Sequence, residues 1–179
     1  MAGAFKVVSR IDNREIMAAL GRLSVRAKRL GPAFKNIGEE LLRSTRQRFA
    51  QQEDPDGHKW QPLKDSTKAN KAAHGYGGQN ILTMRGHLRD SIRYQADERG
   101  VRIGTNRIYG AIHQFGGTTR AHVIRPRDKK ALAWPGARNP VGSVKHPGSR
   151  IPARPFLGVS RRDRERILEI IADHLGAKA

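Results

Sequence analysis

Asp54, Asp56 and His58 place three potential metal ligands in the turn-rich stretch EDPDGHKWQPL, residues 53–63. Carboxylate and imidazole groups are common ligands of divalent cations. If the stretch is aligned as a calcium loop that begins at Asp54, Lys59 occupies the position where the sharp turn requires glycine, so the EF-hand pattern fails. Two alternatives remain: a generic divalent cation site, or carboxylates that cap the turns of their own loop.

His113 is the second candidate for chemistry, because histidine exchanges protons near neutral pH. It begins the sequence His113-Gln114-Phe115, and no carboxylate lies near it in sequence. We interpret it as a hydrogen-bonded structural histidine beside a packed Phe115, with an acid–base role as the alternative. The chain has no Gly-x-Ser-x-Gly elbow, HExxH helix or Walker loop, and GYGGQN lacks the third glycine of a dinucleotide loop. The sequence therefore predicts neither an enzyme nor a cofactor.

Positive charge dominates the composition, with 35 Lys and Arg against 16 Asp and Glu and a formal net charge of +19. Residues 99–162 hold 14 of the basic residues and only one acidic residue, Asp128. Such an excess favours polyanions or acidic protein surfaces as partners. The aromatic residues are not interleaved as a base-stacking platform would require, and no DNA-binding module is recognisable. Contacts to DNA in a channel and contacts to an acidic partner both remain open for the basic set: Arg120, Arg125, Arg127, Lys129, Lys130, Arg138, Lys145 and Arg150.

The chain contains no cysteine, which excludes disulfides, thiolate nucleophiles and Cys-ligated zinc. Its N-terminus lacks the apolar stretch of a signal peptide, and no segment approaches a membrane span. We therefore expect a soluble, unsecreted protein of a reducing cytoplasm that has no membrane partner.

Apolar residues recur at helical spacing across residues 12–50, with an interruption at Gly31-Pro32. Two amphipathic helices joined by so short a link should fold into an antiparallel hairpin. Arg43, Arg46 and Arg48 are expected on its solvent side.

Residues 90–134 carry the strand patterns. Alternation between residues 92 and 103 around a glycine turn predicts a hairpin, and residues 122–134 predict a second hairpin with a charged tip at 127–130. Residues 135–155 lack periodicity and are expected to form an extended loop. Ser160 and Asp163 form a capping pair for a helix over 160–175. The fold class is therefore α+β: one domain of 179 residues with a small, mostly antiparallel sheet, a packed N-terminal helical hairpin, a C-terminal helix and long basic loops.

Large side chains punctuate the loops and are candidate anchors. Burial of an indole removes about 150–250 Å² of side-chain surface from water. Trp60, followed closely by Leu63, should therefore fix its loop to an apolar surface. It either fills the core of its own chain or packs at an interface. Trp134 and Phe156 raise the same question in later loops.

Four blocks of the sequence resemble the phage virion morphogenesis (tail completion) family of Mu-like and related tailed phages. They are Phe49 with DPDGHKWQPL, then ILTMRGHLRDSI, then VRIGTNRIYGAIHQFGG, and IPARPFLGVSRRDRERILEII. The third contains His113, Gln114 and Phe115, and the fourth contains Arg154, Phe156 and Leu157. Residues 118–150 show no recognisable family pattern.

The resemblance implies a structural protein of the tail end or neck, located in the virion, that completes tails or joins them to filled heads. Such a protein is expected to form a homo-oligomeric ring, most often a hexamer, and to contact the tail tube and connector proteins. It carries no catalytic residues. A non-specific nucleic-acid-binding protein that acts through its basic central segment is the alternative.

Overall fold

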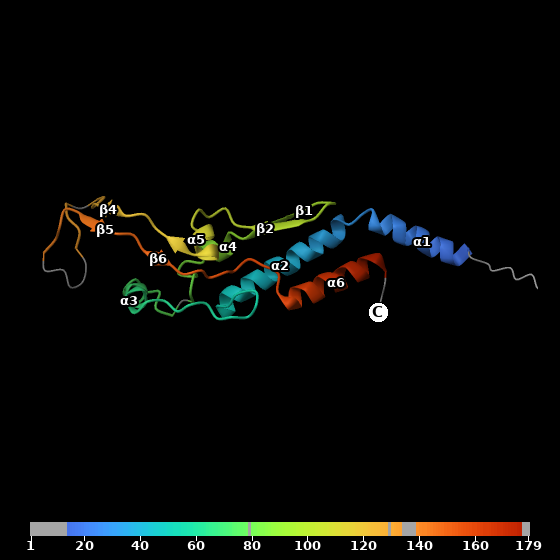
Figure 1. Ribbon diagram of the computed structural model, residues 1–179, viewed down its shortest axis with the longest axis horizontal. Helices are drawn as coiled ribbons and strands as arrows, with labels where there is room; N and C mark the ends of the chain where they lie inside the picture. The colour runs from blue at the N-terminus through green and yellow to red at the C-terminus, as the bar shows by residue number, and fades with distance from the viewer. Residues whose placement is uncertain (1–13, 79, 129, 134–138, 177–179) are drawn as a thin grey trace, which may run out of the picture.

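The computed structural model describes residues 14–78, 80–128, 130–133 and 139–176 of the 179-residue chain. Figure 1 shows an elongated molecule: helices and a β-hairpin form a central body, one helix projects at one end and a long two-stranded arm projects at the other. In chain order the elements are α1 (Arg14–Ala27), α2 (Gly31–Gln51), α3 (Asp65–Ala73), α4 (His87–Asp90), β1 (Arg93–Ala96), β2 (Val101–Gly104), α5 (Gly110–Phe115), β3 (Gly117–Thr118), β4 (His122–Ile124), β5 (Val144–His146), β6 (Arg150–Ile151) and α6 (Arg161–Leu175). The α+β class is confirmed.

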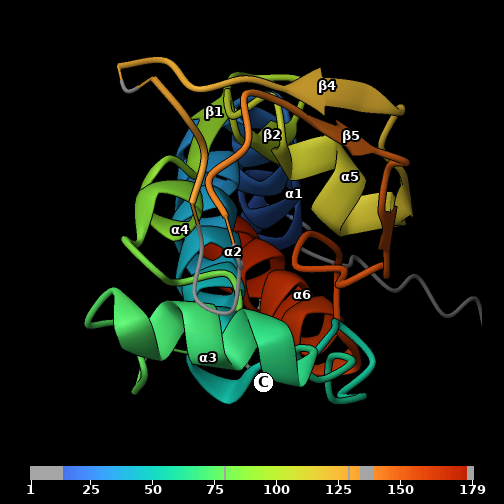
Figure 2. The same ribbon diagram turned by 90° about the vertical axis from the view of Figure 1, so that its left-hand side faces the viewer.

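Helix α2 lies at the centre of the body and contacts the β1–β2 hairpin on one side and α6 on another (Figures 1 and 2). Ala33, Ile37 and Leu41 form its buried stripe, as the helical spacing requires, and Ile170 of α6 packs against them. The predicted hairpin is present: β1 and β2 are antiparallel, and Tyr94 lies opposite Ile103. None of the described helices is long and apolar enough to span a membrane.

A second apolar cluster joins the end of α2 to the loops. Phe49, Trp60 and Phe156 meet here, and the Phe49 ring lies 5.5 Å from the Trp60 ring in an edge-to-face arrangement. Leu88 and Ile92 complete the buried set. Trp60 therefore fills the core of its own chain, which is the first of the two alternatives that the sequence left open.

The N-terminal helices form where expected, but the antiparallel hairpin does not. Figure 1 shows α1 continuing outward from the start of α2, so that the two helices run in the same direction. Every side chain of α1 that the structure describes is exposed, except that of Ala19. The reason is visible at the link: the Gly31 N–H donates to Glu98 Oε2 at 2.8 Å, and the Arg26 carbonyl lies 3.2 Å from His174 Nε2, so contacts to the body fix both ends of the turn.

The prediction of the second hairpin named the wrong partner strand. Residues 122–124 pair with residues 144–146, not with residues 131–134, and residues 117–118 pair with residues 150–151. The expected loop at 135–155 thus contributes two strands. The described residues between 117 and 151 form one long antiparallel excursion, hereafter the arm, which leaves the body beside α5 (Figure 1). The described strands make three separate two-stranded sheets in place of one small sheet.

The C-terminal helix begins where the sequence predicts. Ser160 accepts a hydrogen bond from the Asp163 N–H at 3.0 Å, and Asp163 Oδ2 accepts one from the Ser160 N–H at 2.8 Å. This reciprocal capping box satisfies two N–H groups that the helix cannot pair internally.

Candidate assembly surface

The four motif blocks meet at one place, and Gln114 is its central connector. From the end of α5, its Oε1 accepts hydrogen bonds from the N–H groups of Phe156 and Leu157, both at 3.0 Å, and its Nε2 donates to the Leu157 carbonyl at 2.9 Å. A primary amide pairs with an extended backbone in this way much as a neighbouring strand would. Gln114 therefore fixes the segment that returns from the arm against the helix that precedes the arm.

Arg154 and Trp60 tie the same returning segment to the Trp60 loop, residues 52–63. Arg154 is buried, and its guanidinium donates to the carbonyls of Gln61 at 3.0 Å and Pro62 at 3.3 Å. Trp60 Nε1 donates to the Pro155 carbonyl at 2.9 Å, so its polar atom is paired although the ring is buried. Burial lowers the pKa of Arg154 from its ordinary value, but this value lies so high that the side chain stays charged.

Arg48 corrects the prediction of a solvent-facing side chain on α2. It is only 4% exposed and forms an ion pair with Asp163 at the start of α6. Its other hydrogen bonds go to the carbonyls of Phe156 and Gly158, at 3.2 and 2.9 Å. Burial alone would raise the pKa of Asp163, but hydrogen bonds from Ser44 and Ser160 and the Arg48 charge lower it. The pair thus locks α2, α6 and the returning segment together.

His113 and Phe115 differ from their predicted roles. His113 is half-buried, but its Nδ1 is buried without a hydrogen-bond partner, while its backbone carbonyl accepts from the Arg154 N–H at 2.7 Å. Burial, and then the nearby Arg154 charge, lower the His113 pKa, so the neutral ring is favoured. Phe115 is not packed: it is 79% exposed. Leu63 is half-buried and lines the same groove as His113 and Arg154.

The Asp54, Asp56 and His58 side chains do come together, with possible ligand atoms within 4.8 Å of one another. However, Asp54 Oδ1 already accepts the N–H groups of Asp56 and His58 at 2.9 Å, and its Oδ2 lies 3.2 Å from His58 Nδ1. Burial would raise the pKa of Asp54, yet these hydrogen bonds lower it. The carboxylate has a structural task without a metal, as in turns capped by aspartate.

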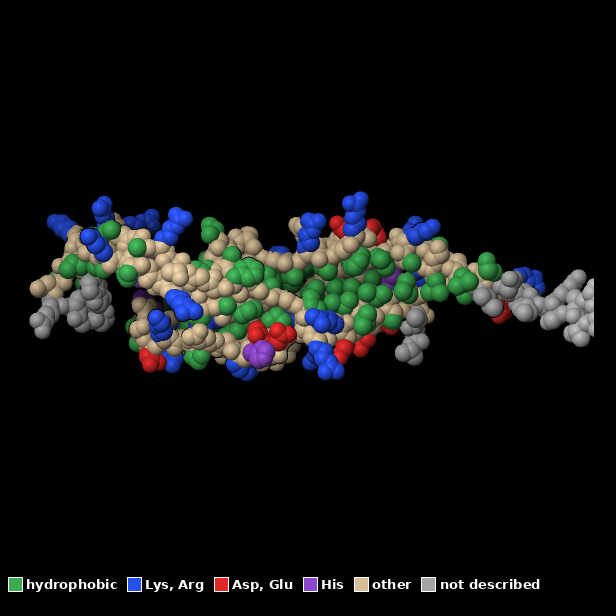
Figure 3. Space-filling view, in the orientation of Figure 1, with side chains coloured by type: hydrophobic (Ala, Val, Ile, Leu, Met, Phe, Trp, Pro, Cys, Tyr) green, Lys and Arg blue, Asp and Glu red, His purple; other side chains and the backbone are tan. Residues whose placement is uncertain are grey.

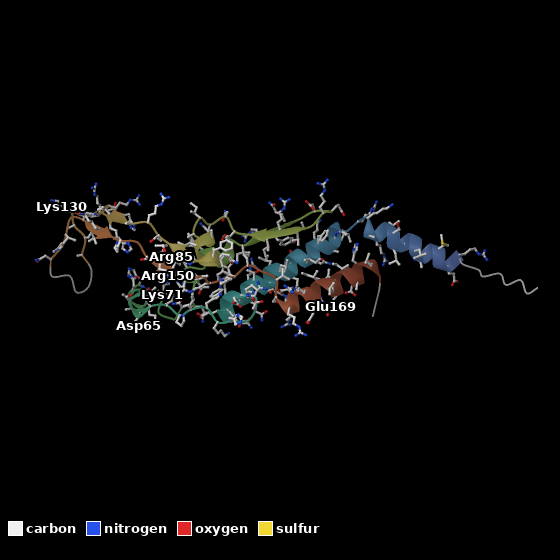
Figure 4. The ribbon with its side chains drawn as sticks, in the orientation of Figure 1. Asp65, Lys71, Arg85, Lys130, Arg150 and Glu169 are labelled. Carbon is white, nitrogen blue, oxygen red and sulfur yellow. The ribbon has the colours of Figure 1, made fainter. Side chains whose placement is uncertain are left out.

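The arm carries its charge without compensation. Its described basic side chains are exposed, and none of them pairs with a carboxylate: Arg120, Arg125, Arg127, Lys130, Lys145 and Arg150. Figure 4 places Lys130 toward the far end of the arm and Arg150 nearer the body, and Figure 3 shows basic side chains along the arm's outer edge. The predicted contacts Lys129 and Arg138, and the anchor Trp134, lie outside the described residues.

Some of the cations of the body do form ion pairs. The ion pairs between described residues lie on helices or in the Trp60 loop, as in Arg43–Glu40, Lys68–Asp65 and Arg166–Glu169. The strands of the arm form no such pairs in the part of the chain that the structure describes. The described cations of the arm therefore lack a paired carboxylate, and the arm presents positive potential to its surroundings.

Sequence reasoning missed Arg48 as a connector. Its position gave a usable signal, because it follows buried Thr45 by three residues and precedes buried Phe49, and so lies on the inner face of α2. A basic residue on such a face needs hydrogen-bond acceptors or a counter-charge within the protein. Asp163 was recognised only as a helix cap.

Comparison with known proteins agrees with the four motif blocks. Residues 11–176 match the family described as "Phage virion morphogenesis family". The chain is also 33% identical over 169 residues to the "Putative capsid assembly protein G" of Escherichia phage Mu, an alignment that covers 93% of this chain and 92% of that protein. No solved structure matches the chain.

Proposed function

The chain belongs to the phage virion morphogenesis family, and from this premise we propose that it is a tail-completion or neck protein that forms a ring, most simply of six copies, at the head-proximal end of the tail. In this role it supports the joining of tails to filled heads through contacts with tail-tube and connector proteins. Its site of action is the virion, after assembly in the host cytoplasm.

The observation that carries this proposal is the division between a body held together by hydrogen bonds and an ion pair, and an arm that projects from it. Gln114, Arg154 and Arg48 fix both ends of the arm to the body through buried and partly buried hydrogen bonds. The strands of the arm are fixed at their base, and their exposed basic side chains form no ion pairs with described residues. Such an arm is suited to contact a neighbouring molecule.

The arm supports a specific contact in this role. It projects its unpaired cations toward DNA in a central channel or toward an acidic neighbour. The same charge favours the alternative function, non-specific nucleic-acid binding by the arm alone, because phosphate contacts require no sequence-reading module.

Removal of the gene from the phage that carries it tests the proposal. We expect electron micrographs of the lysate to show DNA-filled heads and unjoined tails. Empty or malformed heads would instead place the protein in capsid assembly, and normal particles would remove it from morphogenesis.

Variants of the arm separate the two functions. Arg125→Gln with Arg127→Gln should abolish joining while leaving heads and tails intact, whereas Arg161→Gln with Arg166→Gln on α6 should be tolerated. The alternative function predicts a different result. The variants would then bind duplex DNA more weakly, and the slope of log binding constant against log salt concentration would fall by about 0.9 for each phosphate contact removed. If such variants still restore assembly to the phage that lacks the gene, the arm acts on DNA outside the head–tail joint.

A further inference from the structure

Helix α1 presents an amphipathic surface that its own chain does not cover. Leu20, Leu23 and Ala27 share one face at helical spacing, and Leu20 and Leu23 are 54% and 40% exposed. Isolated helices shorter than about 12–15 residues are marginal in water. With 14 residues, α1 needs a partner along most of its length.

The body has an apolar surface of matching kind. Figure 1 shows α2 with the β1–β2 hairpin above it and α6 below it, and no element across the side that faces the viewer. Figure 3 shows a continuous apolar surface in that position. The partly buried apolar residues that pack on the α2–α6 cluster come from α2, β2 and α6: Phe34, Val101, Ile103, Ile167 and Ile171. We call this surface the α2 slot. It lies between the β1–β2 hairpin and α6, and no described helix of the same chain covers it in Figure 1.

The two surfaces match in length and charge. At 1.5 Å per residue α1 is about 21 Å long and α2 about 32 Å, so α1 fits along the slot. Its polar residues include Arg22 and Arg26. Acidic side chains flank the slot on both sides in Figure 3, and the flanking elements supply exposed Asp97 in the hairpin turn and exposed Asp173 on α6.

The chain's own α1 is held away from this slot. Three residues connect α1 to α2, and hydrogen bonds fix both sides of the turn: Glu98 accepts the Gly31 N–H, and His174 Nε2 lies 3.2 Å from the Arg26 carbonyl. Folding α1 back onto α2 would break these contacts. A second copy has no such restriction.

We propose that α1 of one subunit docks in the α2 slot of another copy of the chain, with Leu20 and Leu23 facing the half-buried apolar side chains of α2, β2 and α6. The contact is head-to-tail, because the helix and the slot are different surfaces. Repetition of such a contact closes a ring when the rotation between copies allows it. This inference shares one premise with the proposed function, namely that copies of the chain associate with one another.

Glutamate substitutions test the apolar face against a matched control on the same helix. Val25 is 59% exposed, and at 100° per residue it lies on the face opposite Leu23 and Ala27. Leu23→Glu should weaken self-association by at least about tenfold in sedimentation equilibrium, since the buried leucine contributes that much by apolar burial alone. Val25→Glu should leave it unchanged. Both variants should match the circular dichroism and melting of the wild type at a concentration where the wild type is monomeric, because neither residue is buried in the monomer.

Cross-linking identifies the partner surface. The chain has no cysteine, so only introduced thiols react with a short bis-maleimide. A tagged chain with Leu20→Cys, mixed with an untagged chain with Ile171→Cys, should yield a mixed cross-linked dimer, and Val25→Cys in place of Leu20→Cys should not.

Three results overturn the inference. If the chains associate but no mixed product forms, the ring survives and the docking of α1 fails. If the double variant Leu20→Cys/Ile171→Cys cross-links only within one monomer, α1 covers its own slot. If the wild type stays monomeric at its highest soluble concentration, the docking contact and the proposed ring both fail.

Discussion

The Arg48–Asp163 pair offers the sharpest test of how the body is held together. Removing one partner of a buried ion pair typically costs about 3–5 kcal/mol, because the other charge stays buried without compensation. Here Arg48→Met also leaves the carbonyls of Phe156 and Gly158 without a donor. For a chain of this size, about 2–4 °C per kcal/mol gives a fall in melting temperature of roughly 6–20 °C.

Urea unfolding followed by far-UV circular dichroism measures the loss, and Arg166→Ala is the control. Arg166 also pairs with a carboxylate, Glu169 at 2.7 Å, but both side chains are exposed, so the loss of stability should be much smaller than that of Arg48→Met. In a double-mutant cycle, Arg48→Met with Asp163→Asn should cost less than the sum of the single variants. Additive losses, or a loss below about 1 kcal/mol for Arg48→Met, would refute the assignment.

The pH dependence has a definite sign. The folded-state pKa of Asp163 lies below its ordinary value of about 3.9, so the ionised form stabilises the fold and its contribution is fully present above that pH. The contribution disappears as the pH falls below about 3.9 through the folded pKa. The stability difference between wild type and Arg48→Met should therefore narrow in that range and stay constant between pH 5 and pH 8.

Three further predictions concern the motif junction and the Trp60 loop. Gln114→Leu should cost about 2–4 kcal/mol in urea unfolding, because two backbone N–H groups and one carbonyl lose their partner, whereas Gln114→Glu keeps the acceptor and should cost less. His113 has a folded pKa below its ordinary value of about 6.5, so stability should fall as the pH drops below 6.5, and His113→Gln should flatten that slope; an unchanged slope would contradict it. Asp54→Ala should lower the melting temperature, and millimolar Ca²⁺ or Zn²⁺ should not raise that of the wild type; a metal-dependent rise that Asp54→Ala abolishes would restore the metal interpretation.

The sequence predicted those elements whose signals are local. The capping pair Ser160 and Asp163, the alternation through Tyr94 and Ile103, and the helical spacing of Ile37 and Leu41 depend on neighbours within a few residues, and all three appear in the structure. The α+β class followed from them.

The arm could not be predicted in this way, since its pairing joins distant residues. His122 lies opposite His146, with 23 residues between them, and their rings stack with centroids 5.0 Å apart. The nearer segment, residues 131–134, also carries apolar residues, so periodicity alone gave it preference as a partner. The register depends on how Gln114 and Arg154 fix the two ends of the arm, and each of these contacts spans more than 40 residues.

The failed hairpin prediction has a different origin, and it bears on assembly. Amphipathic spacing indicates an apolar face on α1, but it carries no information on whether a partner for that face is in the same chain. In the single chain, the hydrogen bond from Gly31 to Glu98 and the contact of the Arg26 carbonyl with His174 hold α1 away from α2. Glu98→Gln keeps an acceptor and should preserve this direction, whereas Glu98→Ala frees the link and should let α1 close on its own slot. In sedimentation equilibrium we expect Glu98→Ala to shift the chain toward monomers and Glu98→Gln to leave association unchanged. Equal association of both variants would show that the link does not choose between the two partners.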